Sequence, residues 1–234
     1  MPDESALEIG DCAFCDPEAT KAYRLHEGRN FYVVADYAPV ADAHLLLIPK
    51  QHYPHLAAMP PELDEEFHTL KAHLGDFVRG HYGRLTYWEN GVFGQSVPHA
   101  HLHTIAVDLD TTLFEHLGDR IDDGLASMRM HWQTRGGHYF MVEHEGIGRF
   151  MPPDPDLYIR IIRHAKERNG GMWRYAAPER KLHAEPVVAA MMARWRSTSS
   201  QPASNQLASL HPASAFNPFS VNGEGAEGRV SPTP

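Results

Sequence analysis

The stretch QSVPHAHLHTIAV, residues 95–107, carries a histidine at every second position: His99, His101 and His103. Alternate residues of a β-strand share one face, whereas residues two apart in a helix point to roughly opposite sides. The spacing therefore predicts a strand with three imidazoles in one row. The residues between them are mostly small or apolar, which indicates a strand covered on both faces, where a ring needs a partner or a task.

Three interpretations of this row stay open from the residues alone. The chain holds 17 histidines in 234 residues, so the spacing can arise by chance in an exposed strand. Neutral imidazole is also a common ligand of zinc and other transition metals. Finally, one imidazole that is oriented by its neighbours can act as a nucleophile.

The two cysteines of the chain, Cys12 and Cys15, lie together in CAFC. A disulfide across a gap of two residues would close a small loop and stabilise little. A redox site would place this motif at a helix start in a thioredoxin-like unit, and no such unit follows. Half of a zinc site is the better interpretation, and it needs two histidines from elsewhere to complete it.

Length and composition narrow the class of protein. A chain of 234 residues that is 42% hydrophobic can form one domain, or one domain with an extension. A formal net charge of −9 argues against a nucleic-acid partner, which usually selects a basic face. The sequence has no apolar run long enough to span a membrane and no signal-peptide pattern at its start, so we expect a soluble, cytoplasmic protein without a membrane partner.

The first half of the chain indicates an α+β fold with an antiparallel sheet, because several strands surround one long helix. The strands are expected over residues 23–27, 30–35, 44–50, 85–89 and the histidine segment, and the helix over 61–82.

The second half predicts a short helix at 113–117, a hairpin over 137–151, and helices over 154–168 and 185–196. From residue 197 the chain is rich in Ser, Pro, Ala, Asn and Gly, which is typical of a disordered tail. We therefore divide the chain into 1–110, 111–196 and 197–234.

Three segments carry a family resemblance. HAHLHTI, preceded by GQSV, resembles the signature of the histidine-triad (HIT) superfamily; HLLLIPKQH looks like that family's second signature, and CAFC like the amino-terminal CxxC of many bacterial members. The resemblance implies a HIT-like fold, with a five-stranded antiparallel sheet and a long helix, often paired into a homodimer through a continuous sheet. Residues 111–196 would then be an α/β C-terminal extension packed on the HIT domain, residues 1–110.

The resemblance also implies an activity: hydrolysis at the α-phosphate of a purine nucleotide conjugate through a covalent nucleotidyl-histidine. His101 would be the nucleophile, and His103 would bind phosphate oxygens or assist the leaving group. Gln95 and Ser96 would donate hydrogen bonds to the phosphate or leaving group, and Asp36 would bind the ribose hydroxyls. Candidate substrates are dinucleoside polyphosphates, phosphoramidates and adenylylated small molecules, and the nucleophilic step needs no metal.

Other functions stay open beside this one. A nucleotidyltransferase of the same superfamily would use the same intermediate, although the histidine at position 103, where transferring relatives usually have glutamine, favours hydrolysis. The remaining alternatives are a nucleotide- or zinc-binding module with little turnover and a metalloenzyme with the triad as ligands. The position of the segment after residue 110 suggests that it determines substrate selectivity.

In relatives with CxxC the first triad histidine joins a structural zinc, which here implies the ligands Cys12, Cys15, His52 and His99. The alternative is a pair of reduced cysteines, with His52 and His99 in hydrogen bonds and His99 supporting the catalytic row. His44 is interpreted as structural, and the role of Asn90 stays open.

Overall fold

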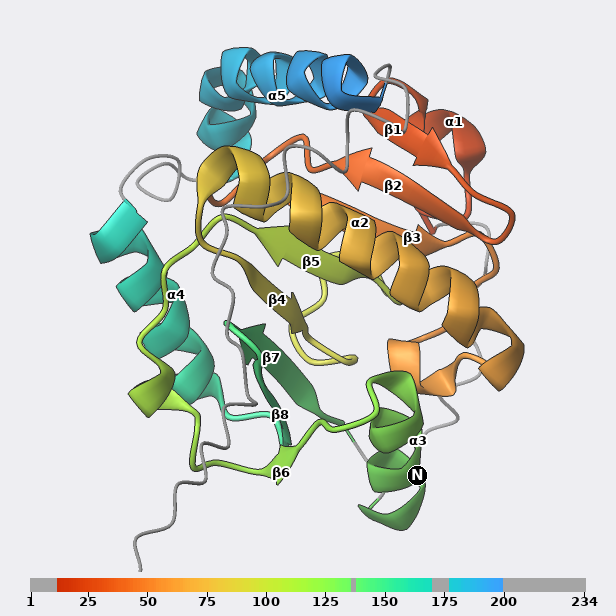
Figure 1. Ribbon diagram of the computed structural model, residues 1–234, viewed down its shortest axis with the longest axis vertical. Coiled ribbons are helices and arrows are strands. Elements are labelled where there is room, and N and C mark those ends of the chain that lie inside the picture. The colour runs from red at the N-terminus through yellow and green to blue at the C-terminus, as the bar shows by residue number, and fades with distance from the viewer. Residues whose placement is uncertain (1–11, 136–137, 170–176, 200–234) are drawn as a thin grey trace, which may run out of the picture. The chain divides into compact units, whose positions relative to one another are not determined.

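A computed structural model describes residues 12–135, 138–169 and 177–199 of the protein (Figure 1). The strands are β1 (Arg24–Glu27), β2 (Phe31–Ala35), β3 (Leu45–Pro49), β4 (Thr86–Glu89), β5 (Leu102–Ile105), β6 (Asp119–Arg120), β7 (Phe140–His144) and β8 (Ile147–Met151). The helices are α1 (Pro17–Lys21), α2 (Asp64–Tyr82), α3 (Leu125–Arg135), α4 (Pro155–Asn169) and α5 (Ala177–Ser199), with short 3₁₀ turns η2 (Leu56–Ala58), η3 (Pro61–Leu63) and η4 (Thr111–Leu113).

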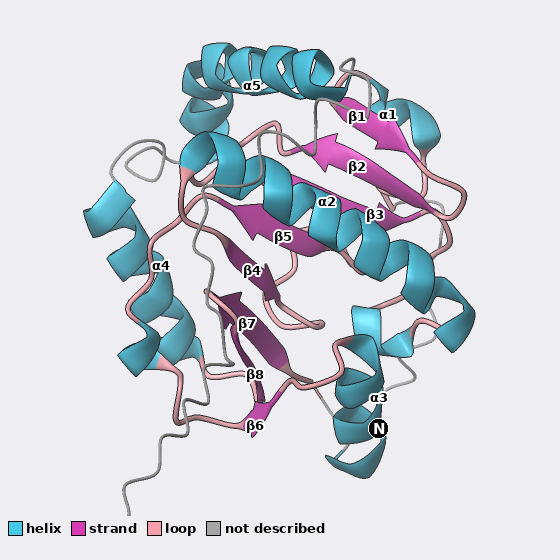
Figure 2. Ribbon diagram, in the orientation of Figure 1, coloured by secondary structure: helices cyan, strands magenta, loops and turns pink. Residues whose placement is uncertain are grey.

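The strands form one antiparallel sheet in the order β1-β2-β3-β5-β4-β7-β8-β6 (Figure 2). This arrangement confirms the α+β class and the five strands expected in the first half of the chain, and it shows that the sheet continues beyond them with β7, β8 and β6. The first five strands would leave the backbone groups of β4 unpaired at an edge, and such an edge pairs readily with another strand. Here β7 pairs with β4, and the hairpin carries the sheet on to β8 and β6.

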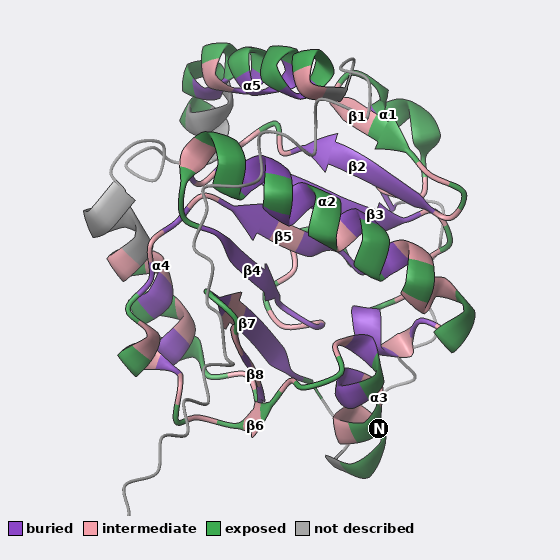
Figure 3. Cartoon of the chain, in the orientation of Figure 1, coloured by how far each residue is buried: buried purple, intermediate pink, exposed green. Residues whose placement is uncertain are grey.

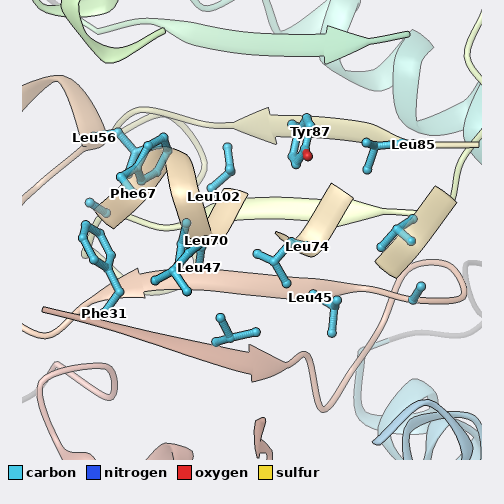
Figure 4. Close-up of a cluster of buried hydrophobic side chains, with 14 of the residues drawn as sticks. Phe31, Leu45, Leu47, Leu56, Phe67, Leu70, Leu74, Leu85, Tyr87 and Leu102 are labelled. Carbon is cyan, nitrogen blue, oxygen red and sulfur yellow. The ribbon is translucent and has the colours of Figure 1, made fainter. Parts of the chain in front are cut away.

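Helix α2 covers one face of the sheet. Acidic residues fill its first turn and basic residues its last, which suits the helix dipole, and Gly83 ends it at a φ of +89°. Figure 4 shows Phe67, Leu70 and Leu74 of the helix among strand side chains such as Leu45 and Leu47. This face is therefore occupied by the hydrophobic core.

Helices from the second half of the chain pack on both faces. On the α2 side, Trp195 of α5 lies 4.9 Å from Phe77, centroid to centroid. Leu157 and Ile161 of α4 instead join a second buried cluster with Trp88. Strands β2 and β3 are buried along their whole length, as the purple ribbon in Figure 3 shows, because both faces are covered.

Opposite α2, the strand register aligns one row of side chains across the sheet. Val34 of β2 faces Leu46 of β3, Leu46 faces His103 of β5, and His103 faces Trp88 of β4. Residues that face each other in antiparallel strands project from the same side of the sheet. The row therefore places one triad histidine between apolar neighbours on the face that α2 leaves uncovered.

Several expected elements differ in extent. The hairpin expected over 137–151 is present as β7 and β8, and its turn has positive φ at Glu145 and Gly146 (47° and 82°), the pattern of a tight I′ turn. The last helix, expected at 185–196, runs over Ala177–Ser199 with Pro186 inside it, and α3 was not expected from the sequence. Residues 200–234 of the expected tail lie outside the described residues, and the division at residue 110 stays a prediction.

In the described part of the chain, no helix is both long enough and apolar enough to cross a membrane.

Candidate active site and metal site

A pocket of about 430 Å³ lies over the row of Val34, Leu46, His103 and Trp88. Pockets that bind small molecules commonly have volumes of about 300–1,000 Å³ with mostly apolar walls and a few polar groups. Its polar lining residues include every phosphate- or nucleotide-binding candidate named from the sequence: Asp36, Gln95, Ser96, His101 and His103.

The three triad histidines do not lie in one row on a single strand. Strand β5 begins only at Leu102, so His99 and His101 precede it, next to Pro98, which has no N–H for a sheet hydrogen bond. His101 and His103 line the pocket with their ring centroids 4.6 Å apart, whereas His99 is fully buried and contacts the two cysteines. The expectation that all three rings lie in one row on one strand was wrong.

A backbone carbonyl fixes the tautomer of His101. The carbonyl oxygen of His99 lies 2.7 Å from His101 Nδ1, and a carbonyl can only accept. His101 Nδ1 therefore carries the proton, and Nε2 keeps its lone pair. This is the form of imidazole that can attack an electrophile.

His103 belongs to a chain of polar contacts that ends at Asp36. The N–H of Val40 donates to His44 Nδ1 at 3.2 Å, so the proton of neutral His44 is on Nε2, which lies 2.9 Å from His103 Nδ1. His103 Nδ1 then accepts, and its Nε2–H is a donor. Asp36 Oδ2 lies 3.3 Å from His44 Nδ1 and can accept a hydrogen bond from it when His44 is charged. His44 thus contacts the triad directly, a role that its position before an apolar strand did not suggest.

Burial keeps both pocket histidines neutral. It lowers the pKa of His101, against a smaller rise from the His99 carbonyl and the charge of Asp36. It lowers the pKa of His103 well below the usual value, and the neighbouring His101 and His44 act in the same direction. At neutral pH the pair can therefore supply one lone pair and one N–H donor.

Cys12, Cys15, His52 and His99 converge, with all four ligand atoms within 4.8 Å of one another. His99 Nδ1 lies 3.3 Å from Cys12 Sγ and 3.4 Å from Cys15 Sγ, and His52 Nδ1 lies 3.3 Å from Cys15 Sγ. Tetrahedral zinc with ordinary bond lengths separates bound sulfur and nitrogen by about 3.5 Å. The spacing of these side chains therefore fits a Cys₂His₂ zinc site.

The protonation of His99 also fits a metal ligand. Its Nε2 lies 2.8 Å from the carbonyl oxygen of Pro49, so that nitrogen donates and Nδ1 turns its lone pair toward the two sulfurs. Burial lowers the pKa of His99 to about 4, which keeps the ring neutral. His99 thus links both sites: its ring faces the cysteines, and its carbonyl holds His101.

Three further residues of the pocket lining bear on its chemistry. Phe14, between the cysteines, is edge-on to His101 at a centroid distance of 5.3 Å. Asn90, whose side chain is 6% exposed, lines the pocket, and among the described residues its Oδ1 has no hydrogen-bond partner. Tyr158 comes from α4, far along the chain. The WENG segment gave a weak signal for Asn90, whereas the sequence around Tyr158 gave none.

The geometry agrees with a family comparison. Residues 19–109 match the family model described as the HIT domain. This segment is a HIT domain. The match covers the pocket residues of the sheet and both pocket histidines, and it ends before the second half of the chain.

One curated relative is the zinc finger CCCH domain-containing protein 64 of Arabidopsis thaliana, 22% identical over 174 residues, or 71% of this chain. The chain spans only 28% of the length of that protein.

Similar solved structures include two HIT family proteins, from Bacillus subtilis (19% identity, 54% of this chain and 98% of that chain, TM-score 0.39) and Bacillus anthracis (18%, 53% and 92%, 0.38). A third is a Zn-bound histidine triad family protein from Mycobacterium smegmatis (22%, 68% and 95%, 0.36). These similarities are weak, and they identify neither a ligand nor an activity for this protein.

Proposed function

We propose that the protein is a nucleotide-conjugate hydrolase that cleaves at the α-phosphate through a nucleotidyl-His101 intermediate. The hydrogen bond from His101 Nδ1 to the His99 carbonyl, 2.7 Å long, supports this most directly, because it leaves Nε2 unprotonated within the pocket. Purine nucleotide conjugates, including dinucleoside polyphosphates, phosphoramidates and adenylylated molecules, are the substrate class.

The reaction proceeds in two displacements. His101 Nε2 attacks the α-phosphorus, a nitrogen–phosphorus bond forms, and the bond to the leaving group breaks with its electron pair. The leaving group takes a proton from solvent as it departs, and neutral His103, whose ring centroid lies 4.6 Å from that of His101, donates its Nε2–H in a hydrogen bond to a phosphate oxygen or to the leaving group. Water then attacks the phosphorus and gives up a proton to solvent, the bond to His101 Nε2 breaks with its electron pair returning to the nitrogen, and a nucleoside monophosphate is released.

The other pocket residues bind and orient the substrate. Asp36, at the end of β2, accepts hydrogen bonds from the ribose hydroxyls while its Oδ1 holds the Ala38 N–H at 2.8 Å. Gln95 and Ser96 donate to phosphate oxygens or the leaving group. Asn90 adds an amide whose buried oxygen gains a hydrogen bond when a substrate donor enters.

A structural zinc held by Cys12, Cys15, His52 and His99 supports this site without taking part in the chemistry. When bound, zinc stabilises a fold by joining distant segments of the chain. Here it would join the loop that carries Phe14, a pocket wall, to the His99 backbone, whose carbonyl orients His101.

The described groups do not favour the triad itself as a metal site. Neither ligand group found among the described residues contains all three triad histidines. Asp36, His44 and His103 do cluster, but His44 Nε2 and His103 Nδ1 are 2.9 Å apart. That distance suits a hydrogen bond better than two ligands of one tetrahedral ion, which would lie about 3.3 Å apart.

A homodimer is also part of the proposal. Because β4 already pairs with β7, a sheet continued between two copies would meet at β1 or β6, and β1 is the longer edge. Sedimentation at several protein concentrations tests this, and a monomer at every concentration would contradict it.

Trapping the intermediate tests the proposed function. The protein is mixed briefly with an AMP phosphoramidate and quenched, and intact mass is measured together with released AMP. We expect an added adenylyl group, absent in His101→Ala and retained in His26→Ala, which removes an exposed histidine of β1 outside the pocket.

Three results separate the alternatives. AMP release without an adduct at any time, with loss of both activity and metal on chelation, would contradict the covalent route. A rise in melting temperature with AMP but no product over hours indicates a binding module. Products in which added phosphate or nucleotide carries the AMP group indicate transfer in place of hydrolysis.

A further inference from the structure

Helix α4, outside the HIT domain match, supplies one wall of the pocket through Tyr158. The first turn of the helix is well fixed. Asp154 Oδ1 accepts the N–H groups of Asp156 and Leu157 at 2.9 and 3.1 Å, and the Asp154 carbonyl accepts that of Tyr158 at 2.9 Å. Leu157 and Ile161 then anchor the helix in the buried cluster around Trp88.

Two other rings hold the ring of Tyr158 in place. Phe93, in the loop after β4, lies 6.0 Å from it at an interplanar angle of 89°. Phe140, at the start of β7, lies 5.8 Å away at 88°. Such edge-to-face contacts stabilise aromatic pairs and favour one orientation. The ring of Tyr158 is therefore held in one orientation at the wall of the pocket.

The strand order separates the two ends of the pocket. Asp36 follows β2, the reacting histidines lie at β5, and Tyr158 contacts the loop after β4 and the start of β7. In an in-line displacement the attacking and leaving groups lie on opposite sides of the phosphorus. If the ribose is at Asp36, the leaving group extends past β5 toward Trp88, Asn90 and Tyr158.

The charge of the lining residues limits which leaving groups the Tyr158 end of the pocket can bind. None of the described residues that line the pocket is a lysine or an arginine. A polyphosphate leaving group would bring several negative charges to a wall of aromatic rings and amides, in a chain whose formal net charge is −9. An uncharged group with a planar ring suits this wall better.

We propose that Tyr158 is a specificity-determining residue that contacts the leaving group and selects nucleotide conjugates whose leaving group is an amine that carries an aromatic ring over those that release a polyphosphate. This inference rests on the proposed function and specifies which nucleotide conjugates the enzyme prefers.

Three conjugates test the assignment: AMP joined through nitrogen to 2-phenylethylamine, AMP joined to propylamine, and diadenosine tetraphosphate. Both amines are primary alkylamines, so the bond that breaks is chemically alike. We expect the full-length protein to prefer the phenylethylamine conjugate over the propylamine conjugate by about 10-fold in kcat/KM, from ring stacking and burial, and to release AMP most slowly from diadenosine tetraphosphate.

Variants then assign the preference to Tyr158. Tyr158→Ala should remove the 10-fold ratio, whereas Tyr158→Phe should keep it. Ile159→Ala is the matched control, because Ile159 is the next residue of the same helix, half exposed and outside the pocket lining. The ratio of two substrates on one preparation does not depend on the folded fraction.

Equal loss for both amine conjugates in Tyr158→Ala, or faster release from diadenosine tetraphosphate by the unmodified protein, overturns this inference and leaves the proposed function standing. Release of AMP from none of the three conjugates overturns the proposed function and the inference together.

Discussion

Glu89 is a fully buried carboxyl group at the end of β4, between Trp88 and Asn90 of the pocket. Its Oε1 accepts the N–H of Leu56 at 2.8 Å, and its Oε2 accepts the hydroxyl of Tyr139 at 2.5 Å. Burial raises the pKa of Glu89 from 4.5 to about 8, although both hydrogen bonds act to lower it. We predict that Glu89 makes the free energy of unfolding decrease as the pH rises.

The sign and size follow from proton linkage. Between pH 4.5 and 8 the folded state binds the Glu89 proton and the unfolded state does not, so the free energy of unfolding falls as pH rises. One pKa unit corresponds to about 1.4 kcal/mol, and between pH 5.5 and 7.5 the expected loss is about 2.5 kcal/mol. For a chain of this length that is a change in Tm of about 5–10 °C.

The variant Glu89→Gln carries no such proton and retains a similar shape. We therefore expect the Tm of the unmodified protein minus that of Glu89→Gln to fall by about 5–10 °C from pH 5.5 to 7.5, measured by scanning calorimetry. Glu65→Gln, at an exposed position in the first turn of α2, controls for a general effect of charge removal. A difference that stays constant with pH, or that grows in the opposite direction, would falsify the burial argument.

Three further predictions concern the site. Cys15→Ser should reduce bound zinc from about one per chain to near zero and should lower the Tm. Elemental analysis measures the zinc and calorimetry the Tm, and an unchanged zinc content would refute the ligand set. His44→Ala should lower kcat about 10-fold or more with a smaller change in KM, since His103 loses the donor that fixes its tautomer; an effect on KM alone would assign His44 to binding. Gly91→Ala should destabilise the fold by about 1–3 kcal/mol in denaturant titrations, because φ is +58° and a Cβ would meet the Tyr139 carbonyl; a smaller cost would show that the loop adjusts.

The HIT domain could be predicted from short-range patterns. The His-x-His-x-His spacing, the apolar strand of HLLLIPKQH and the CxxC motif are local features, and together they indicated the family and the convergence of Cys12, Cys15, His52 and His99. The number of strands could not be predicted in this way. Strand pairing is decided between segments far apart in the chain, and nothing local in β7 shows that it pairs with β4.

The sequence by itself determined which side chains are available for chemistry: three histidines at alternate positions, two cysteines and an acid after an apolar strand. The tertiary structure decided which of these side chains lie in the pocket and which lie at the cysteines. His99 contacts the cysteines and turns its carbonyl toward His101, and His44 reaches His103 from β3's leading end. These assignments depend on hydrogen bonds between groups that only folding brings together. Tyr158 likewise reaches the pocket through tertiary packing, because Leu157 and Ile161 of α4 join the buried cluster that contains Trp88.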